Sequence, residues 1–132
     1  MSGSRPASAS EWLTNEIGEV SVSDLLKKIG SDDGVMTHPE PGLRRQVMSS
    51  SAAMTLVRHR MEKGWVGLRH SHPHEQLVFV ISGAIRLVVD TTPFELRVGD
   101  SVMVPGGVEH EASASEVSEV LDVFTPERTE YL

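Results

Sequence analysis

Histidines occupy alternate positions in one short segment of the chain, at His70, His72 and His74. Side chains of an extended strand alternate between its two faces, so His70 and His72 should point the same way. Two neutral imidazoles that converge on one point are suited to bind a transition metal, although this pair alone leaves a structural role equally open. Pro73 should turn the chain, and we expect His74 to line a turn or a cavity mouth without binding metal.

A second segment, GDSVMVPGGVEH at residues 99–110, also ends in histidine. Pro105 and the glycines after it favour a tight turn, which can direct His110 back into the fold. The chain contains no cysteine, so any metal site must use nitrogen and oxygen ligands. Two separate segments that each supply imidazole strengthen the case for a metal site.

The elements that must position these histidines are typical of short β-strands. Runs rich in Val, Leu, Ile and Phe follow Gly42, and Gly, Pro, Asp or Ser separates most of them. The runs cover residues 43–48, 54–61, 76–82, 84–90, 94–98, 101–105 and 118–124. This pattern predicts an antiparallel sandwich or barrel, and a chain of 132 residues can form one such domain with its own core.

The chain before Gly42 has a different character. Its small polar residues 1–10 predict a flexible tail. Residues 23–30 predict a short helix that Ser23 caps and Gly30 ends. Turn or loop residues occupy 31–34 and 37–42. We therefore divide the chain into an N-terminal extension over 1–42 and a barrel over 43–132.

Charge and hydropathy exclude several classes of partner. The formal net charge is −7 with no basic tract, which argues against nucleic acid and anionic membranes. The first residues lack the apolar core of a signal peptide, and no apolar run approaches the roughly 20 residues that span a bilayer. We expect a cytoplasmic protein that acts on a small molecule.

The two histidine segments together resemble the motifs of the cupin family. The first motif, G-x5-H-x-H-x3,4-E-x6-G, falls on Gly64, His70, His72, Gln76 and Gly83. The second motif, G-x5-P-x-G-x2-H-x3-N, falls in the other segment on Gly99, Pro105, Gly107 and His110, with Ala114 in place of the final Asn. The likeness covers residues 43–132 and implies an all-β, jelly-roll β-barrel with a metal in its lumen.

By this resemblance the metal ligands are His70, His72, Gln76 and His110. Gln76 stands where the family motif has Glu, and a neutral ligand set leaves a divalent ion its full charge and a stronger Lewis acidity. The set suits Fe, Ni, Zn, Mn, Co or Cu and does not choose among them. Glu75 is the alternative fourth ligand if the register of the loop differs.

The end of the chain holds a carboxylate, Asp122, within an apolar run. Burial of a carboxylate is costly unless it has a partner or a task. Asp122 and Phe124 share one face of the expected strand. That face is either the wet outside of the barrel or the lining of the lumen, where Asp122 would act as a general base.

A narrower resemblance favours the lumen. Many small single-domain cupins carry a D-x-F-x-P-x-R tail, which falls here on Asp122, Phe124, Pro126 and Arg128. They include an enzyme of pectin and alginate degradation that opens unsaturated monouronates to linear keto forms. The likeness implies that Asp122 moves a proton, Phe124 packs on the substrate and Arg128 binds its carboxylate. Val78 is apolar where a sugar acid would call for a polar side chain, which counts against a uronate.

We therefore expect a metal-dependent isomerase, lyase or cyclase that acts on a small oxygenated carboxylate through enolate-type proton transfer. The alternatives are a metal-dependent dioxygenase and a non-catalytic cupin that binds metal or a small ligand. Candidate substrate-binding residues are Phe124, Val78 and His74, and candidate catalytic residues are Asp122 and Arg128. We expect a homodimer, with Trp12 and Leu13 as interface candidates. The remaining candidates, namely His38, His59, Arg44 and Arg45, are expected to be ordinary surface or loop residues.

Overall fold

The computed structural model describes residues 21–132. The expected tail over 1–10 and the interface candidates Trp12 and Leu13 lie outside this range. A short helix, α2 (Val22–Leu25), precedes the strands, and a 3-10 helix, η1 (Thr129–Tyr131), ends the chain. The strands are β1 (Val35–Glu40), β2 (Leu43–Ser51), β3 (Met54–Met61), β4 (Glu75–Ser82), β5 (Ala84–Val89), β6 (Thr92–Arg97), β7 (Ser101–Val104), β8 (His110–Ala114) and β9 (Ser118–Thr125).

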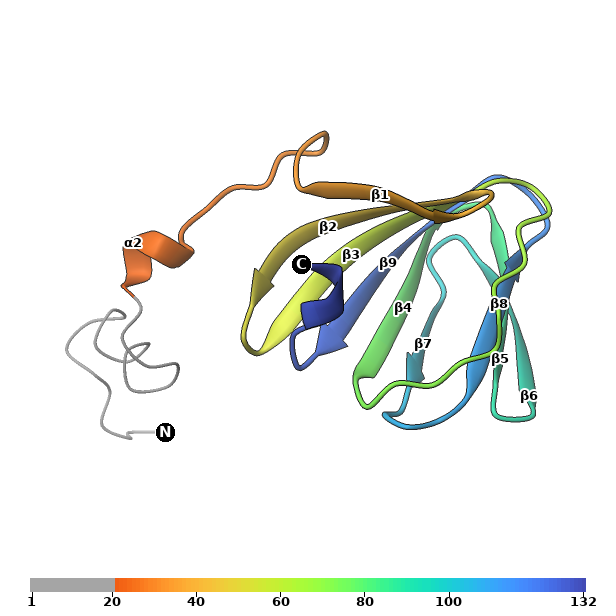
Figure 1. Ribbon diagram of the computed structural model, residues 1–132. Coiled ribbons are helices and arrows are strands. Elements are labelled where there is room, and N and C mark those ends of the chain that lie inside the picture. The colour runs from red at the N-terminus through yellow and green to blue at the C-terminus, as the bar shows by residue number, and fades with distance from the viewer. Residues whose placement is uncertain (1–20) are drawn as a thin grey trace.

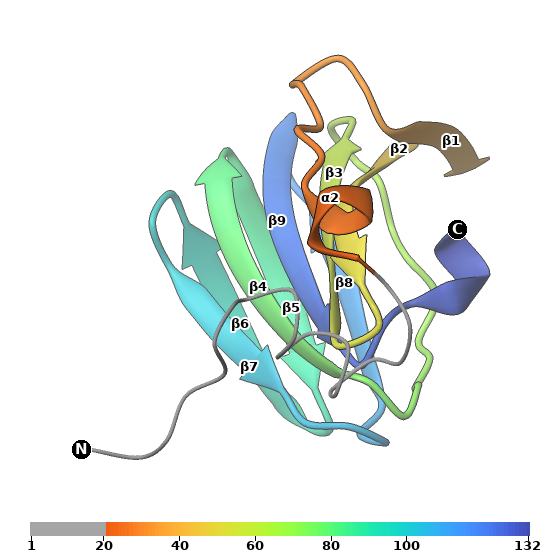
Figure 2. The ribbon, with the colours of Figure 1, turned by 90° about the vertical axis from the view of Figure 1, so that its left-hand side faces the viewer.

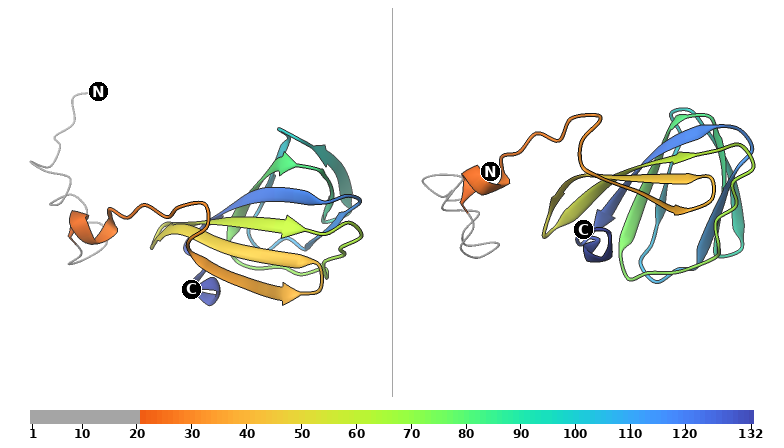
Figure 3. Two further views of the ribbon diagram at one scale, coloured as in Figure 1. Left: turned by 90° about the horizontal axis from the view of Figure 1, so that it is seen from above. Right: turned by 45° about the horizontal axis from the view of Figure 1, so that its top comes forward.

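The strands form two sheets. One has six strands in the order β1-β2-β3-β9-β4-β7, and the other has three in the order β6-β5-β8. The pairs within both sheets are antiparallel. Figures 1 and 2 show the two sheets facing each other across the interior, and Figure 3 shows the curl of the larger sheet from above. The predicted all-β jelly-roll barrel is confirmed.

Alternation of side chains along the strands builds the interior. Every second residue of β9 is buried from Ser118 to Phe124, and β3 shows the same period of two. Because strands alternate their side chains, these positions all face inward. The core is formed by aliphatic residues of both sheets, among them Leu43, Met61, Val80, Ile85, Leu87 and Val120.

The structure differs from the sequence-based expectation at several elements. Strand β1 takes in residues 37–40, which were expected to be loop, and pairs with β2. The large sheet therefore begins at Val35, before the expected boundary at residue 43. Helix α2 ends at Leu25 because Leu26 has left the helical conformation, and its N-cap is Ser21 and not Ser23. Among the described residues, no helix has the length and apolar character needed to cross a bilayer.

Candidate metal centre and its cavity

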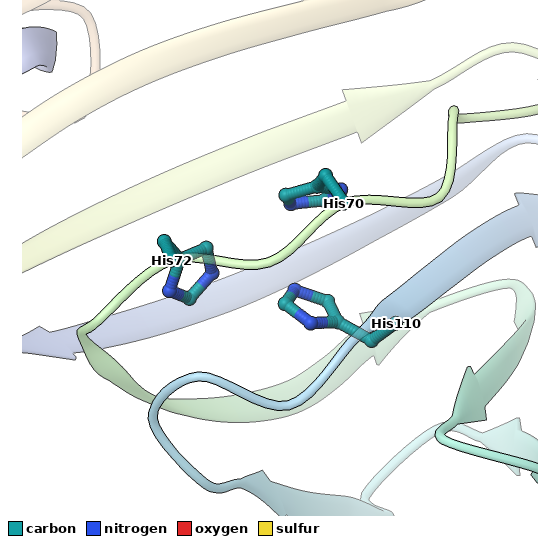
Figure 4. A group of neighbouring side chains, drawn as sticks. All are labelled: His70, His72 and His110. Carbon is teal, nitrogen blue, oxygen red and sulfur yellow. The ribbon is translucent and has the colours of Figure 1, made fainter.

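Three histidines from two segments converge on one point in the interior (Figure 4). A ligand nitrogen of His70, of His72 and of His110 can be chosen so that all three lie within 4.8 Å of one another. His110 begins β8, whereas His70 and His72 lie between β3 and β4. The expectation that a strand end carries the first pair is therefore wrong. His70 is held by backbone hydrogen bonds in both directions with His110, at 3.0 and 2.9 Å.

Glycines let the two segments come close. The amide of Gly107 donates to the carbonyl oxygen of His72 at 2.8 Å, and its φ of +80° is a conformation that favours glycine. A Cβ at Gly106 would lie 2.4 Å from the carbonyl oxygen of Pro73. Because that atom belongs to the backbone, a side chain at residue 106 would push the segments apart. We call these contacts, with the His70–His110 backbone pair, the backbone clasp.

Hydrogen bonds fix the tautomer of all three imidazoles. In each ring Nδ1 lies 2.9–3.0 Å from a backbone carbonyl oxygen two residues away in the chain. A carbonyl only accepts, so the proton sits on Nδ1 and Nε2 keeps a free lone pair. The Nε2 atom of His110 is buried and has no partner within residues 21–132. Lone pairs that face one another, two of them on buried rings, fit a bound cation.

The electrostatic environment keeps His72 and His110 neutral. Burial, followed by the charges of Arg128 and His110, lowers the pKa of His72 to about 4. Burial is also the largest influence on His110 and lowers its pKa below the ordinary value. Both rings are therefore neutral near pH 7, which is the protonation state that binds metal.

Gln76 adds a fourth possible ligand atom, an oxygen, to the three imidazole nitrogens. Its Oε1 lies 3.0 Å from Nε2 of His72, and its Nε2 donates to Oδ1 of Asp122 at 2.9 Å. With the proton of His72 on Nδ1, the 3.0 Å contact joins two atoms that both offer lone pairs. A cation between them would relieve the repulsion. Glu75 is exposed and lies on the opposite face of β4, so the alternative register does not occur.

Asp122 points into the barrel and not to the outside. Its exposed fraction is 3 %, and Nδ1 of His59 lies 2.7 Å from Oδ2. Nε of Arg45 donates to Nε2 of His59 at 3.0 Å. His59 and Arg45 were expected to be ordinary surface residues, and this expectation is wrong because both side chains face the interior. The buried carboxylate thus has partners on both oxygens.

These side chains line one cavity of about 340 Å³ with two unlike walls. The polar wall contains Glu40, Arg45, His59, His70, Gln76, His110, Asp122, Arg128 and Tyr131. The apolar wall contains Leu43, Met61, Trp65, Leu68, Val78, Ile85, Leu87, Ala112, Val120 and Phe124. Val78 therefore lies on the cavity wall, where it is also part of the hydrophobic core.

The C-terminal segment covers the polar wall. The guanidinium carbon of Arg128 lies 4.7 Å from the ring centre of Phe124 and 4.2 Å from that of Tyr131. Tyr131 also lies 3.8 Å from the guanidinium carbon of Arg45. Nη1 of Arg128 is buried without a hydrogen-bond partner in the described chain. A buried cation with a free donor is suited to bind an anionic oxygen.

His74 lies at the bend before β4, which is one of its two expected positions, and not at the cavity mouth. It is buried and does not line the cavity. Its Nε2 lies 3.1 Å from the carbonyl oxygen of Glu127, and its ring packs edge-on against Phe124 with centroids 6.3 Å apart. Its position supports Phe124 from behind and does not offer a group to a substrate.

Comparison with known proteins decides the family. A family model described as a cupin domain matches residues 57–124. The chain belongs to the cupin family. The match runs from β3 to β9 and includes all three histidines of the metal centre. This cupin therefore carries a three-histidine group that can bind a metal.

Relatives of this cupin include a protein of pectin degradation. The chain is 29 % identical over 93 residues to the pectin degradation protein KdgF of Dickeya dadantii, which covers 69 % of this chain and 84 % of the relative. The solved structure of KdgF from Halomonas sp. matches with a TM-score of 0.76 at 28 % identity, covering 80 % of this chain and 98 % of that one. An RmlC-like cupin from Shewanella frigidimarina matches equally well in TM-score and identity, covering 80 % and 95 %.

More distant cupins share the fold alone. A salicylate 1,2-dioxygenase from Pseudaminobacter salicylatoxidans matches with a TM-score of 0.64 at 17 % identity, covering 67 % of this chain and 28 % of the dioxygenase. At this identity the likeness extends to the barrel and not to the chemistry.

Proposed function

We propose that this cupin is a metal-dependent enzyme that isomerises or opens small unsaturated or keto carboxylates by proton transfer at carbon. The observation that carries the proposal is the buried carboxylate of Asp122, which lines the same cavity as His70, His110 and Gln76. A buried carboxylate beside a cation site is the arrangement that a general base requires.

We infer that Gln76 completes the ligand set, giving His70, His72, Gln76 and His110 around one divalent transition metal. Support comes from the free Nε2 lone pairs and from the 3.0 Å contact between Oε1 of Gln76 and Nε2 of His72. The bound ion would supply Lewis-acid stabilisation to an oxygen that becomes negative during the reaction. The ligands are neutral, so an anionic substrate would meet an uncompensated positive charge.

The remaining residues would bind the substrate and move its proton. A carboxylate offers about four lone pairs, so Asp122 can accept a substrate proton while His59 and Gln76 still donate to it. Arg128 would pair with the substrate carboxylate through its free donor. Phe124 would pack against the carbon skeleton, because it forms the part of the wall between Arg128 and His72.

The relatives indicate a substrate class. Two of them are KdgF proteins, and one is named for pectin degradation. We infer that unsaturated monouronates, which carry a carboxylate and several oxygens that could bind a metal, are the first substrates to test. The apolar wall with Val78 extends the range to less hydroxylated unsaturated acids.

The decisive experiment uses the metal-loaded protein with an unsaturated monouronate in D₂O. We expect the conjugated alkene absorbance to fall without oxygen consumption and one deuterium to enter the product at carbon. Oxygen uptake with the same substrate would instead identify a dioxygenase. Binding of the acid without any turnover, across a panel of unsaturated, keto and hydroxy acids, would leave a ligand-binding cupin.

A further inference from the structure

A row of hydrogen bonds crosses four neighbouring strands of the large sheet toward the metal centre. It joins Arg45 on β2, His59 on β3, Asp122 on β9 and Gln76 on β4, which follow one another in the order of the sheet. The four side chains share the inner face. The register places Arg45 directly opposite His59, whereas Asp122 is diagonal to both His59 and Gln76.

Both ends of this row donate toward its middle. Arginine has donors and no acceptor, so Nε2 of His59 must accept from Nε of Arg45. The proton of His59 is therefore on Nδ1 and is donated to Oδ2 of Asp122, 2.7 Å away. At the other end the amide nitrogen of Gln76 donates to Oδ1. The side chain at residue 122 must therefore accept on both sides.

We propose that Arg45 and His59 are positioning residues that, through Asp122, turn the amide of Gln76 so that its oxygen faces the three histidines. If residue 122 offered a donor to Gln76, the amide would rotate and present its NH₂ group to the metal. An NH₂ group has no lone pair to give a cation, so the metal would lose a ligand. The inference rests on the metal site of the proposed function, but not on the reaction.

Asp122→Asn should bring hydrogen-bond donors face to face at residue 122, although asparagine has nearly the same shape as aspartate. Asparagine has one acceptor and one donor, and both of its neighbours donate. His59 cannot change tautomer to accept, because Arg45 occupies its Nε2 with a donor. Gln76 must then rotate, and the metal loses its oxygen ligand. We expect Asp122→Asn to weaken Ni²⁺ binding at least tenfold, the usual effect of losing a residue that orients a ligand.

A second substitution should relieve the conflict. In Arg45→Gln the amide group of the new glutamine occupies the place of the arginine Nε, and it can either donate or accept. His59 can then move its proton to Nε2 and donate it to this glutamine. Nδ1 of His59 then accepts from the new asparagine, whose oxygen accepts from Gln76. We expect Asp122→Asn with Arg45→Gln to recover Ni²⁺ affinity to within about threefold of the protein with Arg45→Gln alone.

Arg45→Met is the matched control. It removes the same positive charge as Arg45→Gln, but its thioether sulfur is only a weak hydrogen-bond acceptor. A purely electrostatic effect would make both substitutions restore Ni²⁺ binding equally to the Asp122→Asn protein. Hydrogen-bond polarity predicts a larger recovery with glutamine than with methionine, because with methionine the Nε2 proton of His59 would remain buried without a partner.

The measurements are Ni²⁺ titration calorimetry on all six proteins and ¹⁵N NMR of the His59 ring in the metal-free protein. We expect the Nδ1–H tautomer of His59 in the wild type and the Nε2–H tautomer in the double variant with glutamine. The Nε2–H tautomer in the wild type would overturn the proposal even if Asp122→Asn did not fold. Unchanged Ni²⁺ affinity in Asp122→Asn, or equal recovery with methionine and glutamine, would also overturn it. None of these measurements needs a substrate, so a wrong substrate class leaves them unaffected.

Discussion

At the scale of single residues, Arg128 is the group through which the proposed substrate should gain affinity. Its Nη1 is buried and unpaired among the described residues, and it would meet a carboxylate away from the reacting carbon. Arg128→Ala should raise KM roughly 10- to 100-fold, the loss of charged hydrogen bonds worth about 1.5–3 kcal/mol. The kcat should change much less.

The control for Arg128 is Arg60→Ala, which removes an arginine whose side chain is 42 % exposed and whose ion pair with Glu119 spans 3.6 Å. This variant should keep the wild-type KM, because exposed ion pairs contribute little. Arg128→Lys should recover part of the affinity but not the bidentate geometry of the guanidinium. Equal losses in kcat and in kcat/KM for Arg128→Ala would place Arg128 in the chemical step.

The lowered pKa of His72 has a consequence for acid stability. The folded value is about 4, whereas an unperturbed histidine titrates near 6.5. Between these values the unfolded chain binds a proton that the folded chain does not, so the metal-free protein should lose stability as pH falls from about 6.5 toward 4. His110 acts in the same direction.

Thermal melts of the metal-free protein between pH 7.5 and 5.5 measure this effect. The midpoint should fall with pH in the wild type, and His72→Asn should flatten the curve. An equally steep curve in His72→Asn would show that other groups control acid stability.

Sequence alone could predict that His70, His72 and His110 come together, because their spacing within two short segments is local. His59 and Arg45 escaped prediction because their partners depend on the register of β2, β3 and β9, which is not local. The sequence nevertheless contained one indication that His59 faces inward. In β3 the residues Val57, His59 and Met61 share a face, and Arg58 lies on the other. A strand that turns arginines outward turns His59 inward.

At the scale of elements, the strands with an apolar pattern in their own sequence were predicted, whereas β1 and β8 were missed. Strand β1 is almost wholly exposed and contains Pro39, so it lacks the apolar alternation that marks a half-buried strand. Strand β8, of sequence HEASA, has no large apolar side chain. Both strands form through pairing with a neighbour that is itself well defined by its sequence.

The tight contact at Gly106 is the element-scale feature that holds the ligands in place. Gly106→Ala would bring a Cβ to 2.4 Å from the carbonyl oxygen of Pro73, which forces the segment that carries His72 to move. We expect Co²⁺ affinity to fall at least tenfold, since ligand placement is sensitive to shifts below 1 Å. Calorimetry with Co²⁺ measures the change.

Gly107→Ala provides the comparison for Gly106→Ala. A Cβ there meets nothing within 4 Å, but φ is +80°. Gly107→Ala should therefore lower the stability of the fold by about 1–2 kcal/mol, and it should affect Co²⁺ affinity less than Gly106→Ala does. Metal affinity that is unchanged in Gly106→Ala would contradict the role of the contact.

At the scale of the whole molecule, metal binding should stabilise the barrel. A ligand that binds only the folded state adds about 2.7 kcal/mol at one hundred times its Kd, which corresponds to a rise in Tm of roughly 5–15 °C. Adding Ni²⁺ or Zn²⁺ should produce this rise, and a chelator should reverse it. His70→Asn removes a ligand that lies outside the core, so its metal-free Tm should stay near the wild type while the metal-dependent rise disappears.

The outer face of the large sheet carries exposed apolar side chains that a second copy of the chain could cover. Leu77, Phe79 and Met103 on β4 and β7 are 36 %, 41 % and 48 % exposed, and Leu77 lies opposite Met103. We expect sedimentation velocity to show a dimer that Phe79→Lys converts to a monomer, because the substitution would bury an unpaired charge. Val66→Lys, at a residue that is 71 % exposed and pairs with Ser113 of β8 in the small sheet, should leave the dimer intact, and a monomeric wild type would refute the expectation.

The backbone clasp holds the two histidine segments together through main-chain contacts, and these contacts are distinct from the side chains that would bind the metal. The hydrogen bonds between residues 70 and 110 and between residues 72 and 107 join main-chain atoms, so they do not require imidazole side chains at positions 70, 72 and 110. Evolution can therefore exchange one ligand at a time, imidazole for carboxylate or amide, while the folded frame persists at every step. A protein engineer has the same freedom. Under the proposed ligand set, Gln76 in place of the Glu of the family motif is one such exchange, and further exchanges are a practical route to new metals and new reactions.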